Sequence, residues 1–260
     1  MLPTASKSSL VLSGCTHWID KPAFVDQFAD TTKRDIGTVF HAGAELLLHG
    51  KALPDVVDGC KKQLRTMWKG DVARLPDANQ VVSRMLRSTD TYIRESRGVI
   101  WEMLGTEVAV SVHVKHWGRA ILDVTDRGYP DNPLLFCGTA DLVGLDKHGL
   151  WVADWKTGGT DTARDQMMSL AAILAPPDHG ATICTLSVRE DGVYSWDEYL
   201  SRDELDDHLG RVMTALTSPI GEPNPGAHCV AMYCPYLYNC PATNRAIEEF
   251  AGDDKAPKDR

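Results

Sequence analysis

The stretch Gly138-Thr139-Ala140-Asp141 decides the fold of this chain, together with Trp151-Val152-Ala153-Asp154-Trp155-Lys156-Thr157-Gly158, which follows it after a short turn. Apolar residues surround the first aspartate, and the turn at residues 146–149 ends in a glycine. This pattern is typical of two antiparallel strands joined by a short loop. We therefore expect a β-hairpin that carries two acidic residues and one lysine.

These three charged residues are expected to meet on one face of the hairpin. Side chains alternate between the two faces of a strand, so Asp154 and Lys156 lie on the same face. Pairing across the hairpin brings Asp141 beside them. Such a group is costly unless a cation and an anion bind there, and a divalent metal with a phosphate satisfies all three. The alternative is an exposed Asp/Lys pair at a strand edge, worth less than about 1 kcal/mol and without chemistry.

The composition is that of a soluble globular protein. The chain has 260 residues, of which 43% are hydrophobic and 24% charged, which is ordinary for one α/β domain. No apolar run approaches the length of about 20 residues that crosses a bilayer, and no secretory signal is evident. Seven cysteines without such a signal indicate reduced thiols or metal ligands. We expect a cytoplasmic protein, in a bacterium or a phage-infected cell.

The charge is distributed unevenly. The net charge is −9, yet residues 31–97 carry twelve basic against eight acidic residues, while residues 190–260 carry six against fourteen. Basic residues at helical spacing could line one side of a groove: Lys61, Lys62, Arg65, Lys69, Arg84, Arg87, Arg94 and Arg97. A solvated helix face explains the same spacing equally well. The basic half therefore permits DNA binding without indicating it.

Periodicity predicts an α/β fold with a mixed central sheet. Helices are expected over residues 34–50, 53–69, 78–97, 162–174 and 201–217. Besides the hairpin described above, strands are expected over residues 107–117, 119–126, 181–189 and 192–199. We interpret the chain as one domain, 1–260, with a helical N-terminal part at 11–104, a sheet core at 105–200, and a C-terminal helix with a cysteine-rich segment at 201–250.

An aspartate separated by twelve residues from Asp-x-Lys resembles the PD-(D/E)XK nuclease superfamily, with Asp154 where many members carry glutamate. The sequence Asp154-Trp155-Lys156-Thr157-Gly158 is similar to the RecB-type branch, which includes CRISPR-associated RecB-like exonucleases. That branch carries Gly-x-x-x-His on an early helix, and Gly37 and His41 match this motif. The resemblance implies a restriction-endonuclease-like fold, with helices on both sides of the sheet.

The resemblance also implies roles for individual residues. Mg²⁺ or Mn²⁺ would be bound by His41, Asp141, Asp154 and the main-chain carbonyl of Trp155, and the histidine nitrogen favours Mn²⁺ somewhat. Lys156 would orient the attacking water or stabilise the transition state. The remaining site residues are Gln166, on the following helix, and Glu107, an additional candidate acid. A lone helical histidine is more often structural, and Leu170 stands where the family usually has tyrosine.

A third element consists of cysteines near both ends. Some RecB-type exonucleases hold a [4Fe–4S] cluster with one N-terminal and three C-terminal cysteines, which here correspond to Cys15, Cys229, Cys234 and Cys240. Four residues separate Cys229 from Cys234, where the family usually has two. Zinc, with His228 as a further ligand, and a degenerate site are the alternatives. Three other cysteines are expected in the core: Cys60, Cys137 and Cys184.

The expected activity is that of a metal-dependent DNA exonuclease that cleaves linear DNA without sequence specificity. The resemblance places such enzymes in recombination, repair or end processing, including phage exonucleases that work beside a strand-annealing recombinase. One alternative is a catalytically silent DNA-binding subunit, although the acidic residues, lysine and histidine are all retained. Another is a structure-specific endonuclease of the same fold.

Overall fold

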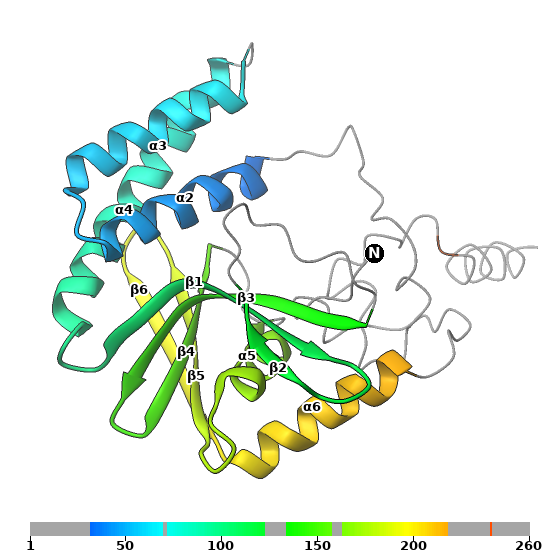
Figure 1. Cartoon of the computed structure of the whole chain (residues 1–260). Helices are drawn as coiled ribbons and strands as arrows, with labels where there is room; N and C mark the ends of the chain where they lie inside the picture. The colour runs from blue at the N-terminus through cyan, green and yellow to red at the C-terminus, as the bar shows by residue number, and fades with distance from the viewer. Residues whose placement is uncertain (1–31, 70–71, 123–133, 158–162, 218–239, 241–260) are drawn as a thin grey trace, which may run out of the picture.

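A computed structural model describes residues 32–69, 72–122, 134–157, 163–217 and 240 (Figure 1). In these described residues, five helices lie on the two faces of one sheet, so this part of the fold has three layers. Helices α2, α3 and α4 form one outer layer, and α5 with α6 form the other. Their bounds are α2 Thr32–Leu48, α3 Leu53–Met67, α4 Leu75–Ser96, α5 Ala163–Leu174 and α6 Arg202–Thr217, with a short 3₁₀ turn, η2, at Val72–Arg74.

Within the described part of the chain, the central layer is a six-stranded mixed sheet in the order β2-β1-β3-β4-β5-β6. Its strands are β1 Glu102–His113, β2 Arg119–Ile121, β3 Leu135–Asp146, β4 Gly149–Lys156, β5 Ala181–Val188 and β6 Val193–Leu200. All neighbours are antiparallel except β4 and β5, which are parallel and connected through α5. Parallel strands need such a crossover, usually a helix. The predicted α/β fold with a mixed sheet is therefore confirmed.

The predicted hairpin is formed by β3 and β4. Its register closes with Asp146 opposite Gly149, and Gly149 has a φ of +117°, a backbone conformation that glycine adopts without strain. A carboxylate oxygen of Asp146 accepts a hydrogen bond from the main-chain N–H of His148 at 2.7 Å, which stabilises the turn. The hairpin thus follows from local turn chemistry, as the sequence indicates.

Each face of the sheet has its own hydrophobic core. On strand β4, Val152 packs with the α5–α6 side, whereas Ala153 and Trp155 pack with the α2–α4 side. This alternation agrees with the predicted division of the strand into two faces. The three cysteines expected in the core are buried, namely Cys60, Cys137 and Cys184.

Two elements begin well before their predicted starts, and strands β1 and β2 end earlier than predicted, at His113 and Ile121. Helix α4 begins at Leu75 rather than at residue 78, because Pro76 occupies its first turn, where a missing N–H costs no helical bond. Strand β1 begins at Glu102, five residues before the predicted start, because a tight turn after α4 returns the chain directly to the sheet. In that turn Gly98 N–H donates to the carbonyl of Trp101 at 2.6 Å.

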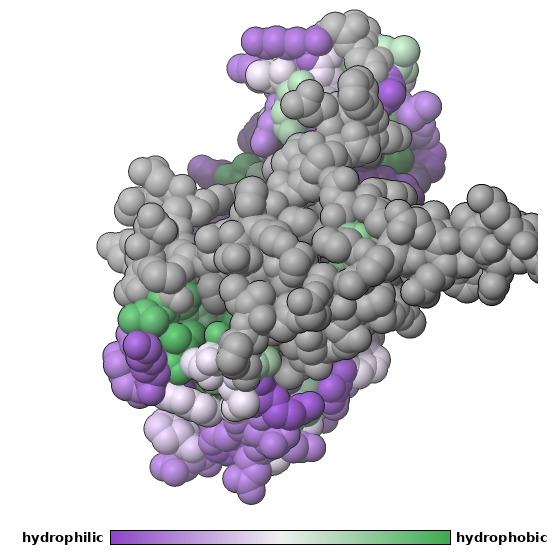
Figure 2. All heavy atoms as spheres, turned by 90° about the vertical axis from the view of Figure 1, so that its right-hand side faces the viewer, coloured by the Kyte–Doolittle hydropathy of each residue, from purple (hydrophilic) through white to green (hydrophobic). Residues whose placement is uncertain are grey.

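The outer surface of the helical layer is hydrophilic. Figure 2 shows hydrophilic side chains at the top of the molecule, the level of α3 in Figure 1. Several of the basic residues singled out in the sequence form ion pairs there: Lys61 with Asp58, Arg84 with Glu190, and Arg94 with Asp90. Ion pairing of this kind is expected of a solvated helix face. Within the described residues, every helix is too short or too polar to span a membrane.

One buried histidine joins α5 to α6. His208 has no exposed surface, and its Nε2 lies 2.9 Å from the Ser169 hydroxyl oxygen. Burial disfavours the charged imidazolium and lowers the pKa of His208 to about 4. In the unfolded chain the pKa of a histidine is about 6.5. Between about pH 4 and pH 6.5, His208 is therefore protonated in the unfolded chain and neutral in the folded chain.

We predict an acid-sensitive contact between these helices. Stability from neutral His208 is fully present above about pH 6.5 and is lost as the pH falls toward 4, by about 3 kcal/mol in all. Urea unfolding of wild type and His208→Gln over this range measures the effect. Between about pH 6.5 and pH 4, the free energy of unfolding of the variant should fall by about 3 kcal/mol less than that of wild type. Parallel curves for the two proteins would contradict the assignment.

Candidate active site

Two carboxylates face each other across the middle of the sheet. Val108 pairs with Ala140 and Thr106 with Leu142 in the antiparallel ladder of β1 and β3. Glu107 therefore lies opposite Asp141, between these two pairs. Like charges directly opposite each other destabilise a sheet. This pair needs a compensating cation or hydrogen-bond donor to persist.

The backbone at Glu107 is unusual. Its φ is +49°, in the left-handed region that residues other than glycine rarely adopt. Strained backbone of this kind concentrates at functional sites, where the surrounding structure holds it in place. Nearby, the strand alternation of β3 is interrupted: Ala140 packs in the core on the α5 side, and Leu142 in the core on the α2 side. The irregularity therefore coincides with the position of the two carboxylates.

Helix α2 brings a histidine to the same place. Phe40, the residue before His41, packs edge-to-face against Trp155 at 6.3 Å between ring centroids. One turn earlier, Gly37 lies so close to β4 that a Cβ atom there would stand 3.2 Å from the Thr157 hydroxyl oxygen. The glycine thus permits the close approach of α2, and the aromatic contact fixes the orientation of the helix over the sheet.

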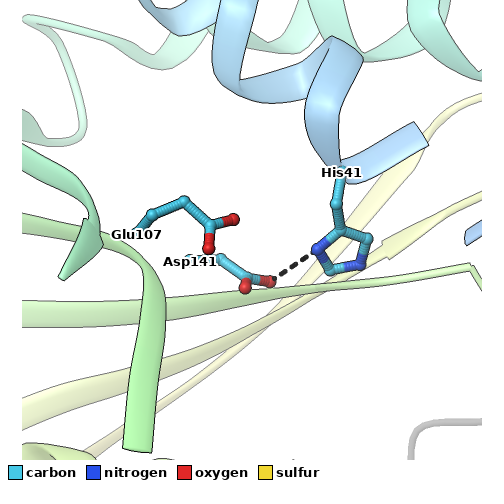
Figure 3. Close-up of side chains that lie close together, drawn as sticks. All are labelled: His41, Glu107 and Asp141. Atoms are coloured by element: carbon cyan, nitrogen blue, oxygen red, sulfur yellow. Dashed lines mark ion pairs between the residues drawn. The ribbon is translucent and has the colours of Figure 1, made fainter. Parts of the chain in front are cut away.

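His41, Glu107 and Asp141 form a compact cluster of metal-ligand atoms. One ligand atom from each of the three side chains lies within 4.8 Å of the others, and all three are partly exposed. Figure 3 shows the three side chains directed toward one another from α2, β1 and β3. Ligands of one Mg²⁺ ion at about 2.1 Å stand no more than about 4.2 Å apart. Small side-chain movements would therefore bring one nitrogen and two oxygens onto a common ion.

The negative charges around His41 raise the pKa of its imidazole. Its Nδ1 lies 3.3 Å from an Asp141 carboxylate oxygen. Burial alone lowers the pKa of His41, but the hydrogen bond to Asp141 and the charges of Asp141 and Asp154 outweigh it, so the pKa is raised. A proton on His41 and a metal ion compensate the same carboxylates. Metal binding should therefore compete with protonation and strengthen as the pH rises.

Asp154 and Lys156 form a second, deeper part of the site. Asp154 is only 2% exposed, and one of its carboxylate oxygens lies 2.6 Å from Lys156 Nζ. The Gln166 side-chain amide of α5 donates to its other oxygen at 3.4 Å. Burial and the nearby Asp141 carboxylate raise the pKa of Asp154, although Lys156 acts in the opposite direction. A buried carboxylate thus depends on its lysine for charge compensation.

The two parts are joined through the backbone of β4. The main-chain N–H of Trp155, between Asp154 and Lys156, donates to an Asp141 carboxylate oxygen at 2.8 Å. This hydrogen bond fixes the Asp141 carboxylate above the end of β4. The hydrogen bond therefore links the metal-ligand cluster to the strand that carries Asp154 and Lys156.

A cleft of about 370 Å³ opens onto the cluster. The His41, Glu107 and Asp141 side chains line one part of it, and Lys33 and Arg34, from the first turn of α2, line another. The cleft therefore presents acidic groups suited to a cation next to basic groups suited to an anion. A larger cavity of about 1040 Å³ near Trp101 and His148 contains none of the residues of this cluster.

The sequence-predicted site residues come together only in part as expected. His41 and Asp141 are grouped with Glu107, whereas Asp154 is buried with Lys156 and Gln166. Leu170, at the position of the family tyrosine, is fully buried in the core and cannot reach a substrate. Sequence reasoning did not single out Lys33 and Arg34, because a basic pair at a helix start carries no specific signal.

The cysteine prediction lies largely outside the described part of the chain. Cys15, Cys229 and Cys234 are among the residues that the structure does not describe, and Cys240 is partly exposed. The cluster predicted to be shared by these four cysteines therefore lies outside the described residues, apart from Cys240.

Comparison with known proteins identifies the family of this chain. The chain is similar to the crystal structure of SSO0001, with 12% identity, a TM-score of 0.35, and coverage of 83% of this chain and 98% of that one. No curated protein matches the chain. The profile of the PD-(D/E)XK nucleases matches residues 21–241, and the mixed sheet between helices is consistent with their restriction-endonuclease-like fold. The chain therefore belongs to the PD-(D/E)XK nuclease superfamily, whose members are metal-dependent nucleases.

Proposed function

We propose that this protein is a metal-dependent DNA exonuclease that hydrolyses phosphodiester bonds without sequence specificity. The observation that carries the proposal is the cluster of His41, Glu107 and Asp141 beside the buried pair of Asp154 and Lys156. His41, Glu107 and Asp141 supply metal ligands that line the cleft, and Lys156 supplies a positive charge next to Asp154. This is the combination that phosphodiester hydrolysis requires.

The donor set fits a hard divalent ion. His41, Glu107 and Asp141 would hold one or two Mg²⁺ or Mn²⁺ ions, with Asp154 and the Trp155 carbonyl as further oxygen ligands, and the imidazole nitrogen favours Mn²⁺ somewhat. When bound, the ion supplies an activated water and positive charge next to the phosphate. Glu107, which the sequence indicated only as an additional acid, thus becomes a principal ligand in this proposal.

The remaining residues act on the water and the phosphate. Lys156 would orient the attacking water or stabilise the negative charge that develops on the phosphate oxygens. Gln166 and Lys156 hold Asp154 in place through the contacts described above. Lys33 and Arg34, on another part of the cleft, suit the phosphate that neighbours the scissile one, because phosphate contacts position nucleic acid without reading its sequence.

We also propose the cellular setting that the RecB-like motifs imply. The enzyme would act on linear DNA with free ends in recombination, repair or end processing in the cytoplasm of a bacterium or a phage-infected cell. A strand-annealing recombinase would be its partner, since a resected end exposes the single strand on which such a protein acts. The single-domain organisation over residues 1–260 belongs to the same proposal.

A [4Fe–4S] cluster held by Cys15, Cys229, Cys234 and Cys240 completes the proposal. Three of these cysteines lie within twelve residues and the fourth is far away in the chain. A shared cluster would close a very long loop. By analogy with disulfides, this would restrict the unfolded chain and stabilise the folded protein by about 3–5 kcal/mol. It would link the two ends of the domain without taking part in hydrolysis.

The metal site can be tested without DNA. Calorimetric titration with Mn²⁺ should show binding to wild type, weakened roughly tenfold or more in His41→Ala, Asp141→Asn and Glu107→Gln. The matched control is Glu102→Gln, which changes an exposed glutamate on β1, the strand that carries Glu107. This variant should bind Mn²⁺ like wild type. Equal affinities for Glu107→Gln and wild type would remove Glu107 from the ligand set.

The exonuclease activity is tested with end-labelled linear DNA and closed circular DNA of the same sequence, each with Mg²⁺ or Mn²⁺. We expect degradation of the linear form and survival of the circle, and loss of activity in Asp154→Ala and Lys156→Ala, with both variants still folded by circular dichroism. Cleavage of the circle would indicate an endonuclease. Binding of DNA without cleavage by the metal-loaded wild type would indicate a catalytically silent subunit.

The cluster prediction has an optical readout. Anaerobically purified protein should be brown, absorb near ~400 nm and contain about four iron atoms per chain. Cys229→Ser should be colourless and less soluble, whereas Cys60→Ser, which replaces a buried core cysteine, should keep its colour as long as it folds. Iron-free, colourless and fully active protein would contradict the prediction, and stoichiometric zinc would replace it with a zinc site.

A further inference from the structure

Strand β6 is an exposed sheet edge with large aromatic side chains. It is the last strand in the sheet order, and its only strand partner in the described part of the chain is β5 (Figure 1). Tyr194, Trp196 and Tyr199 are each about half exposed, at 50%, 49% and 51%. Proteins usually protect such an edge with a lysine, a proline or a bulge. β6 has none of these, and its register with β5 is unbroken from Val193 to Leu200. Its two acidic residues are already bound within the chain: Asp197 accepts a hydrogen bond from Trp151 Nε1 at 3.3 Å, and Glu198 accepts from Arg164.

The hydrogen-bond pattern shows which backbone groups of β6 point outward. Arg189 N–H donates to the Gly192 carbonyl at 2.9 Å across the β5–β6 turn, so this opposed pair is hydrogen-bonded. Bonded and non-bonded pairs alternate along an antiparallel ladder. Tyr194, Trp196 and Glu198 therefore bond inward to β5, whereas Ser195, Asp197 and Tyr199 direct their N–H and C=O groups to the open edge.

An edge of this kind can be extended by a second copy of itself. Two antiparallel copies can pair only if outward-facing residues oppose outward-facing residues, which restricts the twofold axis to a position at a residue of β6. Side-chain chemistry then distinguishes the registers. With the axis at Asp197, the two Asp197 carboxylates would face each other, which is unfavourable.

The register with the axis at Trp196 avoids this repulsion. Trp196 meets its own copy in a non-hydrogen-bonded pair, where side chains are closest. Ser195 then lies opposite Asp197, a hydroxyl opposite a carboxylate. Tyr194 lies opposite Glu198, and Arg164 already neutralises Glu198 through two hydrogen bonds of 2.7 and 2.8 Å. The edge is therefore complementary to itself in its backbone hydrogen bonding and in its charges.

We propose that two copies of this protein associate through their β6 edges, with Trp196 at the twofold axis, to form one continuous sheet across the dimer. The partner surface is β6 of the second copy, and the outward N–H and C=O groups of Ser195 and Asp197 form the new ladder. Trp196 is the central side-chain contact. It makes no aromatic or cation–π contact among the described residues of its own chain.

Disulfide trapping tests this register. In Trp196→Cys the two new cysteines face each other with Cα atoms about 4.5 Å apart, within the range for a disulfide. In Tyr194→Cys, the matched control, the two cysteines are offset by four residues, or about 13 Å, and cannot bond. Mild oxidation of the full chain should convert most of the Trp196→Cys protein to a reducible dimer, while Tyr194→Cys and wild type stay unlinked. Equal trapping at both positions would overturn the register.

The backbone ladder is tested separately by light scattering and sedimentation over a concentration series. Wild type should form a dimer, and Ser195→Pro, which removes only an outward N–H, should weaken it roughly tenfold or more. Ser195→Ala keeps the N–H and should remain within a factor of about three of wild type. Circular dichroism verifies that all variants are folded. A wild-type protein that is monomeric at the highest soluble concentration, or a dimer unaffected by the proline, would overturn the proposal.

Discussion

The central constraint of this structure is the concentration of three carboxylates at one place in the sheet. Glu107 and Asp141 oppose each other on neighbouring strands, and Asp154 is buried close to them. Such a group is unfavourable unless each charge has a partner. Lys156 supplies one for Asp154, the Trp155 N–H and the His41 imidazole supply others for Asp141, and the open side of the cleft is left for a cation.

This arrangement depends on contacts between layers that are distant in sequence. Trp155 packs between Phe40 of α2 and Tyr92 of α4, with ring centroids 6.3 and 6.1 Å away. The same strand that carries Asp154 and Lys156 therefore also anchors the helix that carries His41. Side chains alternate along β4. Asp154 and Lys156 therefore lie in the charged site, whereas Ala153 and Trp155 pack in the core beneath the helices α2–α4. The geometry of the site therefore depends on the packing of both cores.

The charge distribution follows from the same geometry. The net charge of −9 does not describe the surface that faces a substrate, because many basic residues of the helical layer pair with nearby acids. The basic groups that line the cleft are Lys33 and Arg34, at the start of α2. A mixed cleft suits a ligand that combines a cation with a phosphate, and an acidic protein as a whole does not exclude such a ligand.

The sequence by itself determined the features that are local. Turn chemistry at residues 146–149 and the period of two along β4 predicted the hairpin and the shared face of Asp154 and Lys156, because both depend on neighbours in the chain. The sequence resemblance already placed His41 and Asp141 in one metal site, but the tertiary structure alone decided that Glu107 stands opposite Asp141 and that Asp154 is buried in contact with Gln166. These contacts depend on the register of β1 against β3, a left-handed backbone at Glu107, and the packing of helices onto the sheet. No local pattern encodes them, since each brings together residues that lie far apart in the chain and are fixed only when the two cores close.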